Sequence, residues 1–270
     1  MPELPEVETI RRGLEPHLVD RLIESVVVRE TRLRYPLSLD LPGQLMGQRI
    51  ERVGRRGKYL QMAWREGGLL IHLGMSGSLR LSPRDTPPRV HDHLSLTLAN
   101  GPVLHFHDPR RFGLVLWSAD PGHHPLLERL GPEPWDAGFN GGYLHQASHN
   151  RQRAIKALLL DQTLVAGVGN IYASEALFLA GIHPARSAGD IAKKRYERLV
   201  SSIRSVLDQA IIQGGTTLRD FRNEQDRPGY FAQSLKVYGR TGQPCQQCAG
   251  VVCEIRIGQR SSFYCPACQH

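Results

Sequence analysis

The spacing of hydrophobic and polar positions predicts a leading helix followed by a run of strands. Apolar side chains recur at helical intervals at Val7, Ile10, Leu14 and Leu18, and Pro5 suits the first turn of such a helix. Segments rich in β-branched and apolar residues then predict strands within 22–29, 49–64, 68–81, 93–108 and 111–117. The first 120 residues are therefore predicted to form a mainly antiparallel sheet domain with one helix in front of it.

One hairpin within this region has a specific turn signal. Leu94, Leu96 and Leu98 alternate with polar residues, and Asn100-Gly101 follows them directly. Asn-Gly accepts the positive φ angles that tight hairpin turns require. The pattern predicts two antiparallel strands joined at residues 100–101.

After residue 120 the pattern changes to helical spacing. Residues 121–142 are rich in Pro and Gly and read as a linker. Helices are predicted within 151–161, 170–181 and 193–213, with Gly181 and Gly214 at the positions of C-terminal caps. Residues 217–234 show little periodicity and predict a loop.

The last residues carry four cysteines at a metal-binding spacing: Cys245, Cys248, Cys265 and Cys268. Two Cys-x2-Cys pairs separated by 16 residues match a structural zinc site with four thiolate ligands. The segment between the pairs predicts a β-hairpin that turns at Gly258-Gln259, and Cys253 is expected to be a packed side chain within it. Arg260 follows the turn, where it either contacts a phosphate or remains solvated.

Charge and composition narrow the class of partner. Of 270 residues, 34 are Lys or Arg and 26 are Asp or Glu, so the formal net charge is +8. This excess indicates an anionic partner, with nucleic acid ahead of a membrane surface. No apolar run reaches the roughly 20 residues that span a bilayer, and the first residues contain no secretory signal, so we expect a cytoplasmic protein that does not contact membranes.

Several short motifs occur in an order that resembles the formamidopyrimidine-DNA glycosylase family of bacteria. They are MPELPEVE at the start, GKYL around Lys58, HLGMSGSLR (72–80), HDH (91–93), DPRRFG (108–113), DQTLVAGVGNIYASEALF (161–178), GGTT (214–217) and the four-cysteine hairpin. The resemblance covers essentially the whole chain and implies an α+β protein. Its implied parts are a β-sandwich domain (1–120), a linker (121–142), a helix–two-turn–helix domain with a lesion loop (143–234) and a zinc β-hairpin (235–270).

The resemblance also implies the reaction. The family removes oxidised purines, such as 8-oxoguanine and formamidopyrimidines, from duplex DNA through an imine on an N-terminal proline, and then cleaves the strand by β,δ-elimination. Pro2 would be that nucleophile once Met1 is removed, because a terminal amine titrates well below lysine, so more of it is neutral at pH 7. Glu3 would be the acid–base residue, and Lys58 and Arg260 would assist elimination. Glu6 has either a catalytic role or a structural one at the start of the helix.

The resemblance implies DNA contacts at His72, Met75, His91, Arg110, Phe112, Arg151 and Asn170, with Lys156 as a further contact. Enzymes that act on a base in a duplex extrude it first. Phe112 would wedge between bases, Met75 would fill the vacated space, and Arg110 would bond the orphaned cytosine. From the residues alone, Met75 and Phe112 could instead be packed in a core, and Asn170 could be a simple helix cap.

Three other functions are compatible with parts of the sequence. The related endonuclease VIII shares the Pro-Glu start and the zinc hairpin but prefers oxidised pyrimidines. A non-catalytic DNA-binding protein could use the same scaffold, and a zinc-ribbon adaptor would explain the cysteines but not the N-terminus. We expect a monomeric DNA glycosylase with AP lyase activity, one structural zinc ion, and double-stranded DNA with the lesion opposite cytosine as its substrate.

Overall fold

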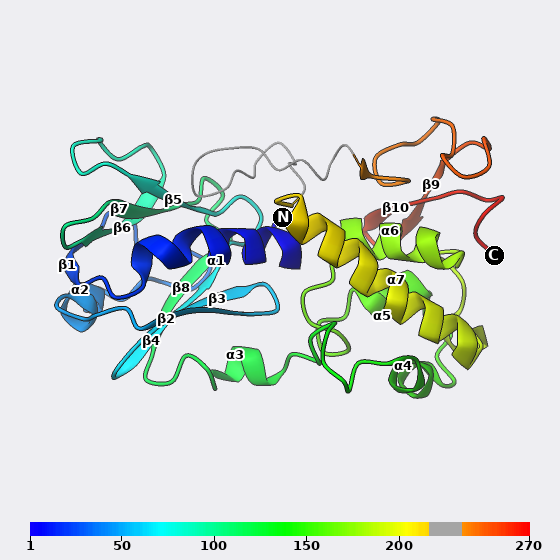
Figure 1. Ribbon diagram of the computed structural model, residues 1–270, viewed down its shortest axis with the longest axis horizontal. Helices are drawn as coiled ribbons and strands as arrows, with labels where there is room; N and C mark the ends of the chain where they lie inside the picture. The colour runs from blue at the N-terminus through cyan, green and yellow to red at the C-terminus, as the bar shows by residue number, and fades with distance from the viewer. Residues whose placement is uncertain (216–233) are drawn as a thin grey trace. The chain divides into compact units, whose positions relative to one another are not determined.

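The chain packs into two units, which are described separately (Figure 1). The computed structural model describes residues 1–215 and 234–270. One unit contains residues 1–128 and 213–215, and the other contains residues 129–212 and 234–270. The predicted lesion loop at 217–234 lies outside the described residues except for Ser234.

The first unit is a sandwich of two four-stranded antiparallel sheets with strand orders β1-β6-β7-β5 and β2-β3-β4-β8. Their strands are β1 (Ile23–Val28), β2 (Arg52–Arg56), β3 (Tyr59–Trp64), β4 (Gly67–His72), β5 (Ser78–Ser82), β6 (Asp92–Leu98), β7 (Val103–His107) and β8 (Leu114–Ser118). Apolar side chains of both sheets and of helix α1 (Leu4–Leu18) form one core. The β-sandwich prediction with a leading helix is confirmed.

Two predicted strand segments are each divided by a turn. Residues 49–64 form β2 and β3 around Gly57-Lys58, so Lys58 lies in a turn and not within a strand as predicted. Residues 68–81 form β4 and β5, which belong to different sheets. The chain changes sheet at residues 73–77, where Gly74 has a φ of 62° that residues with side chains rarely adopt. The predicted β6–β7 hairpin is confirmed, and Asn100 has a φ of 51° in its turn.

The second unit is built on helices: α4 (Gly141–Ser148), α5 (Ile155–Leu159), α6 (Asn170–Ala180), the 3-10 turn η1 (Ala188–Asp190) and α7 (Lys193–Ile212). Helix α7 packs against α4 and α6. The helices predicted within 170–181 and 193–213 are confirmed, and α6 ends at Gly181 with a left-handed φ of 70°. Helix α5 is shorter than predicted because Ala154 forms a β-bridge with Ser187 before the helix begins.

Three short helices were not predicted. They are α2 (Leu41–Leu45), α3 (Pro125–Glu128) and α4, and the last two fall in or next to the segment read as a linker. Helix α4 begins with two glycines, which are poor helix formers. The Asn140 side chain offsets this cost because its Oδ1 accepts the Tyr143 N–H at 3.0 Å and caps the helix.

The C-terminal part of the second unit is the predicted β-hairpin. Strands β9 (Cys253–Ile257) and β10 (Arg260–Tyr264) pair through a turn in which Gly258 has a φ of 60°. A small cluster of Phe178, Val237, Val252, Phe263 and the buried cysteines connects this hairpin to α6. The four-cysteine hairpin prediction is confirmed.

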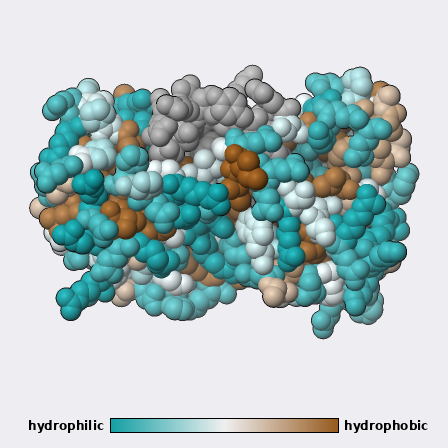
Figure 2. Space-filling view, viewed as in Figure 1, coloured by the Kyte–Doolittle hydropathy of each residue, from teal (hydrophilic) through white to brown (hydrophobic). Residues whose placement is uncertain are grey.

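The molecular face seen in Figure 2 is mostly hydrophilic, and its apolar side chains form small separate patches. Within residues 1–215 and 234–270, no helix is both long enough and apolar enough to cross a membrane.

Candidate active site and nucleic-acid interface

Pro2 and Glu3 lie immediately before helix α1, and both are buried. Glu3 is the N-cap residue of the helix, and its backbone N–H donates to Glu6 Oε2 at 2.9 Å. Of the two roles predicted for Glu6, catalytic or structural, this bond supports the structural role at the start of the helix. This bond fixes the backbone directly after Pro2, so the position of the proline nitrogen is set by the first helical turn.

A glycine pair from a distant part of the sequence lies against this helix start. Gly214 and Gly215 have φ angles of 76° and 81°. A side chain on Gly215 would place its Cβ 3.1 Å from Glu6 Oε1. Both glycines of the GGTT motif therefore adopt φ angles that favour glycine. At Gly215, a side chain would also crowd the Glu6 carboxylate.

A buried carboxylate anchors α1 to the sheet beneath it. Glu8 accepts hydrogen bonds from Arg11, Arg12 and, at 3.0 Å, from Arg55 Nε of strand β2. Burial alone would raise the pKa of Glu8, but these three guanidinium groups lower it overall. Because β2 leads directly into the turn that carries Lys58, this ion pair holds α1 against the strand that precedes Lys58.

Lys58 and His72 are neighbours at the ends of paired strands. Lys58 is only 7% exposed, and Tyr59 is paired in register with His72, with ring centroids 4.8 Å apart. Burial, with the charges of Lys58 and Arg34, lowers the pKa of His72 to about 4. Its Nδ1 accepts the Gly74 N–H at 2.9 Å, so Nε2 carries the proton and can donate to a phosphate oxygen.

His72 is expected to remain neutral down to about pH 4 and to make the fold acid-sensitive. Between pH 6.5 and 4 the unfolded chain protonates this ring while the folded chain does not, so the free energy of unfolding falls as the pH is lowered through that window. NMR titration of the His72 ring proton, assigned with His72→Gln, measures this directly. A midpoint near the ordinary value of 6.5 would contradict the expectation.

Met75, Arg110 and Phe112 are brought together by two adjacent loops. We call residues 73–77 the Met75 loop and residues 108–113 the Phe112 loop. Met75 is 40% exposed and Phe112 is 46% exposed, which excludes core packing for both side chains. The Arg110 guanidinium lies over the Phe112 ring, 4.9 Å from its centroid.

The two loops meet backbone to backbone. A Cβ added to Gly74 would lie 2.4 Å from the carbonyl carbon of Phe112 and 2.5 Å from the nitrogen of Gly113. These distances are shorter than any real side chain tolerates, so position 74 must be glycine for the loops to approach this closely. The loops that carry Met75 and Phe112 are therefore in direct backbone contact.

His91 lies beside the Phe112 loop and is exposed. Its φ of 73° is unusual for a residue with a side chain. Its ring packs edge-on against the rings of His93 and His107, with centroids 6.0 and 6.1 Å away. His107 in turn bonds the buried Asp92, whose pKa is lowered to about 2 because hydrogen bonds and nearby charges outweigh its burial.

In the second unit, two side chains converge on the residue after Arg260. Asn170 Nδ2 donates to the carbonyl of Ser261 at 3.2 Å, and Lys156 Nζ donates to the same carbonyl at 3.0 Å and to Ser262 Oγ at 2.9 Å. Lys156 is 1% exposed, so its side chain supports the hairpin in this structure, and its contact with DNA stays a prediction. Its charge supports the start of strand β10, where Arg260 is exposed.

Arg151 is also exposed, in the segment before α5. Its carbonyl accepts the Gly189 N–H at 2.9 Å, which holds the backbone while leaving the guanidinium at the surface. The two exposed arginines and the half-buried Asn170 are thus available in the second unit for contact with a polyanion.

Glu175 connects α6 to the segment that leads into the zinc hairpin. Its carboxylate accepts the backbone N–H groups of Lys236, Val237 and Tyr238 at 2.9, 3.0 and 2.8 Å. Burial raises the pKa of Glu175, although these three bonds stabilise its charged form. A single acidic residue in an otherwise apolar helix is the sequence signal that could have identified this buried anchor.

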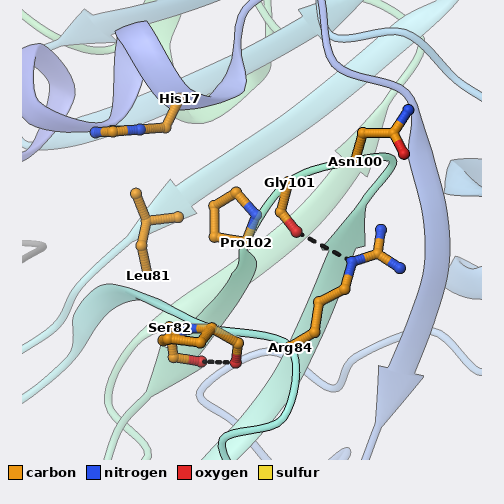
Figure 3. Close-up of a pocket in the computed structure, with 8 residues that line it drawn as sticks. His17, Leu81, Ser82, Arg84, Asn100, Gly101 and Pro102 are labelled. Atoms are coloured by element: carbon orange, nitrogen blue, oxygen red, sulfur yellow. Dashed lines mark hydrogen bonds between the residues drawn. The ribbon is translucent and has the colours of Figure 1, made fainter.

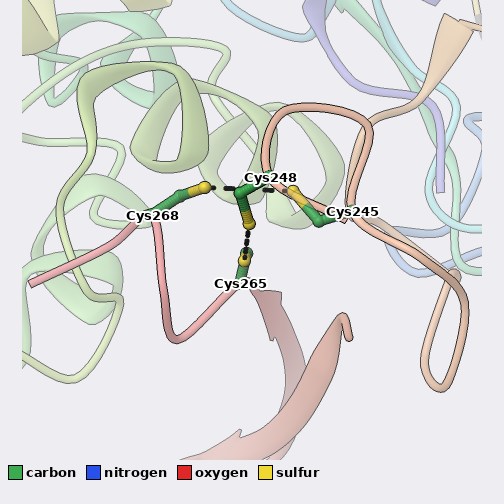
Figure 4. Close-up of side chains that lie close together, drawn as sticks. All are labelled: Cys245, Cys248, Cys265 and Cys268. Carbon is green, nitrogen blue, oxygen red and sulfur yellow. Dashed lines mark hydrogen bonds between the residues drawn. The ribbon is translucent and has the colours of Figure 1, made fainter. Parts of the chain in front are cut away.

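The four cysteine sulfurs converge at the base of the hairpin (Figure 4). All four Sγ atoms lie within 4.8 Å of one another, and two of the separations are 3.5 and 3.9 Å. Zn–S bonds of about 2.3 Å in a tetrahedron place sulfurs about 3.8 Å apart, so the arrangement fits one zinc ion with four thiolate ligands. With no open position for water or substrate, this zinc is structural.

A separate cavity of about 640 Å³ lies at the edge of the β-sandwich and is lined by residues that include His17, Ser82, Arg84 and Asn100 (Figure 3). It contains none of the predicted site residues. Arg84 donates to Gly101 O at 3.1 Å and pairs with Glu24, so its charge is already neutralised. We assign the reaction elsewhere, because no predicted site residue lines this cavity.

Family models match three successive parts of the chain. They are described as the formamidopyrimidine-DNA glycosylase N-terminal domain (residues 1–115), the formamidopyrimidine-DNA glycosylase H2TH domain (130–222) and a zinc finger found in FPG and IleRS (242–270). The chain belongs to the formamidopyrimidine-DNA glycosylase family. A member from Nitrosococcus oceani is 56% identical over 271 residues and aligns over the full length of both chains.

Solved structures of family members share the fold throughout. A mutant of the Lactococcus lactis FPG, in complex with DNA containing Fapy-dG, has a TM-score of 0.92 and 36% identity over 100% of both chains. The wild-type Lactococcus lactis FPG, in complex with DNA containing an oxidised pyrimidine, has a TM-score of 0.91 and 35% identity over 100% of both chains. Family membership confirms the predicted class, a base-excision-repair DNA glycosylase with AP lyase activity that carries a structural zinc.

The sequence analysis does not predict the supporting roles of Lys156 and Glu175. Lys156 and Glu175 are charged residues inside apolar helical segments, AIKALLL and YASEALF, and that isolation is the signal that indicates a buried partner. Asp108 lies in the DPRRFG motif, where its sequence signal is weak because an aspartate in a loop is usually exposed.

Proposed function

We propose that this chain excises oxidised purines, including 8-oxoguanine and formamidopyrimidines, from double-stranded DNA with Pro2 as nucleophile. The observation that carries the proposal is the start of α1, where the buried Glu3 follows Pro2 directly and its backbone is held by Glu6. This arrangement puts the proposed nucleophile next to a carboxylate in the sequence, and covalent catalysis calls for a nucleophile with an acid–base group nearby. The positive end of the helix also disfavours protonation of the proline amine.

The reaction uses the two residues in sequence. The Pro2 nitrogen attacks C1′ of the extruded nucleotide, and the glycosidic bond breaks with its electrons on the departing base, which takes up the proton that the amine loses. Glu3, acting as an acid, then protonates O4′ as the sugar opens. The resulting iminium carries a permanent positive charge because proline is a secondary amine. It accepts the electron pair released when the C2′ proton is removed, so the 3′ phosphate leaves by β-elimination and the 5′ phosphate follows by δ-elimination. Lys58 and Arg260 support these steps at the phosphates.

DNA contacts are proposed on both units. Met75, Arg110 and Phe112 would occupy the space of the extruded nucleotide, with Arg110 donating to O2 and N3 of the orphaned cytosine. Their exposure and their shared support favour this role. His72, His91, Arg151 and Asn170 would contact the phosphate backbone, which supplies much of the affinity and its salt dependence. The enzyme is proposed to act as a monomer on cytoplasmic DNA.

Borohydride trapping tests substrate class and mechanism together. Duplexes with 8-oxoguanine opposite cytosine, 8-oxoguanine opposite adenine and thymine glycol are compared at equal concentrations. We expect the fastest adduct formation with 8-oxoguanine opposite cytosine. Thymine glycol is a necessary comparison because a related enzyme has been solved with an oxidised pyrimidine in its DNA. A preference for thymine glycol would assign the chain to the oxidised-pyrimidine class, and DNA binding without any adduct would contradict the mechanism.

A further inference from the structure

The two carboxylate oxygens of Asp108 accept hydrogen bonds from two loops, the Met75 loop and the Phe112 loop that contains Asp108 itself. The residue is fully buried. Its Oδ1 accepts the Ser76 hydroxyl of the Met75 loop at 2.7 Å, and its Oδ2 accepts the backbone N–H of Gly113 in its own loop at 2.7 Å. Both bonds are short and charge-assisted, which makes them stronger than bonds between neutral groups. One carboxylate therefore fastens the Met75 loop to the Phe112 loop.

The Ser76 hydroxyl adds a second connection between the same loops. While its proton is donated to Asp108, its oxygen accepts the backbone N–H of Arg110 at 3.2 Å. The hydroxyl cannot rotate without breaking one of these bonds. Arg110 and Met75, which flanks Ser76, thus have their backbones fixed relative to each other.

The backbone of Asp108 is also held by the HDH segment (91–93). Its N–H donates to the carbonyl of His91 at 3.1 Å, and its own carbonyl accepts the Nε2–H of the buried His93 at 2.7 Å. His91 adopts its positive φ where its carbonyl receives this bond. The buried carboxylate is consequently tied to strand β6 as well as to both loops.

We infer that Asp108 is a positioning residue for strand invasion, acting through Ser76 and Gly113 to present Met75, Arg110 and Phe112 as one rigid unit. The inference rests on the proposed function for the role of those three side chains. Rigid support lowers the conformational cost of inserting them into a duplex, because the loops are ordered before DNA binds. Asp108 itself is buried and touches neither the proposed substrate nor the nucleophile.

Asp108→Asn tests the inference because an amide has only one acceptor oxygen. In this variant either the Ser76 hydroxyl or the Gly113 N–H would face the N–H₂ group of the amide. We expect single-turnover excision of 8-oxoguanine opposite cytosine to slow by about 10- to 100-fold, the range expected when a reacting geometry is displaced by about 1 Å. Cleavage of an abasic site in single-stranded DNA should change less than about twofold, because that substrate needs no invasion. Ser76→Ala should act in the same direction, and the exposed Asp120→Asn is the matched control.

A variant background separates positioning from general stability. When Met75, Arg110 and Phe112 are all alanine, adding Asp108→Asn should have no further effect on excision, since nothing remains to be positioned. An equal loss in both backgrounds, or no loss with either Asp108→Asn or Ser76→Ala, would overturn the inference while leaving the proposed function intact. If the triple variant excises as fast as the wild type, the proposed role of the three side chains fails, and the inference fails with it. Should Asp108→Asn not fold, Ser76→Ala carries the test alone.

Discussion

A two-residue extension ahead of Pro2 is expected to abolish the borohydride adduct and to slow strand cleavage at lesions by at least about 10³-fold. The extension converts the secondary amine of Pro2 into an amide, whose lone pair is delocalised and cannot attack C1′. Met1 is 40% exposed in the structure, so additional residues have space and the fold should survive. Denaturing gels after borohydride treatment measure the adduct, and intact mass spectrometry establishes whether Pro2 is the first residue of the active protein.

Two variants distinguish the loss of the amine from damage to the helix start. Pro2→Gly keeps a terminal amine and should form a weaker adduct, because its imine must be protonated to become a good electron sink. Pro5→Ala changes the first turn of α1 without touching the amine and should trap nearly as well as the wild type. Undiminished trapping by the extended chain would show that the nucleophile is a different residue, and peptide mapping of the adduct would identify it.

Removing the zinc, by chelation or by Cys248→Ser, is expected to unfold the C-terminal hairpin and to eliminate detectable binding of lesion DNA. Structural zinc sites contribute about 10–16 kcal/mol of apparent binding free energy to such small units. The apolar cluster beneath the hairpin is too small to replace that contribution. Arg260 depends on the hairpin for its position, so its proposed phosphate contact would be lost. Elemental analysis reports the zinc content, and fluorescence anisotropy reports the affinity for DNA.

The fifth cysteine supplies a matched control. Cys253 lies in β9, outside the group of four, and its thiol contacts only the carbonyl of Val251 at 3.7 Å among the described hydrogen bonds. Cys253→Ser should therefore retain one zinc ion and bind DNA normally. Wild-type affinity in the chelated protein would mean that the hairpin does not contribute to DNA recognition.

Elements specified by a few neighbouring residues could be predicted from the sequence. The β6–β7 turn depends on Asn100-Gly101, the end of α6 depends on Gly181, and the metal site depends on the spacing within each cysteine pair. In each case the residue type and its nearest neighbours determine the backbone conformation. The catalytic and DNA-contact roles of individual residues came from the family resemblance and remain predictions.

Features that depend on distant residues could not be predicted from spacing. The burial of Lys156 depends on Ser261, which is 105 positions away, and the bond from Ser76 to Asp108 spans 32 positions. Helix α4 was missed because Gly141-Gly142 disfavours a helix locally. The structure resolves this conflict, since a Cβ on Gly141 would lie 2.5 Å from Glu197 Cγ of α7. Glycine is required there by tertiary packing, which overrides its low helix propensity.

The backbone contact at Gly74 also has a consequence for protein engineering and for divergence within the family. Because residues 73–77 and 108–113 share that contact and the Asp108 carboxylate, neither stretch can be exchanged alone without leaving a clash or an unsatisfied buried group. A graft intended to change opposite-base selectivity has to transfer both stretches together. Over evolution, the two stretches should likewise be inherited as a pair.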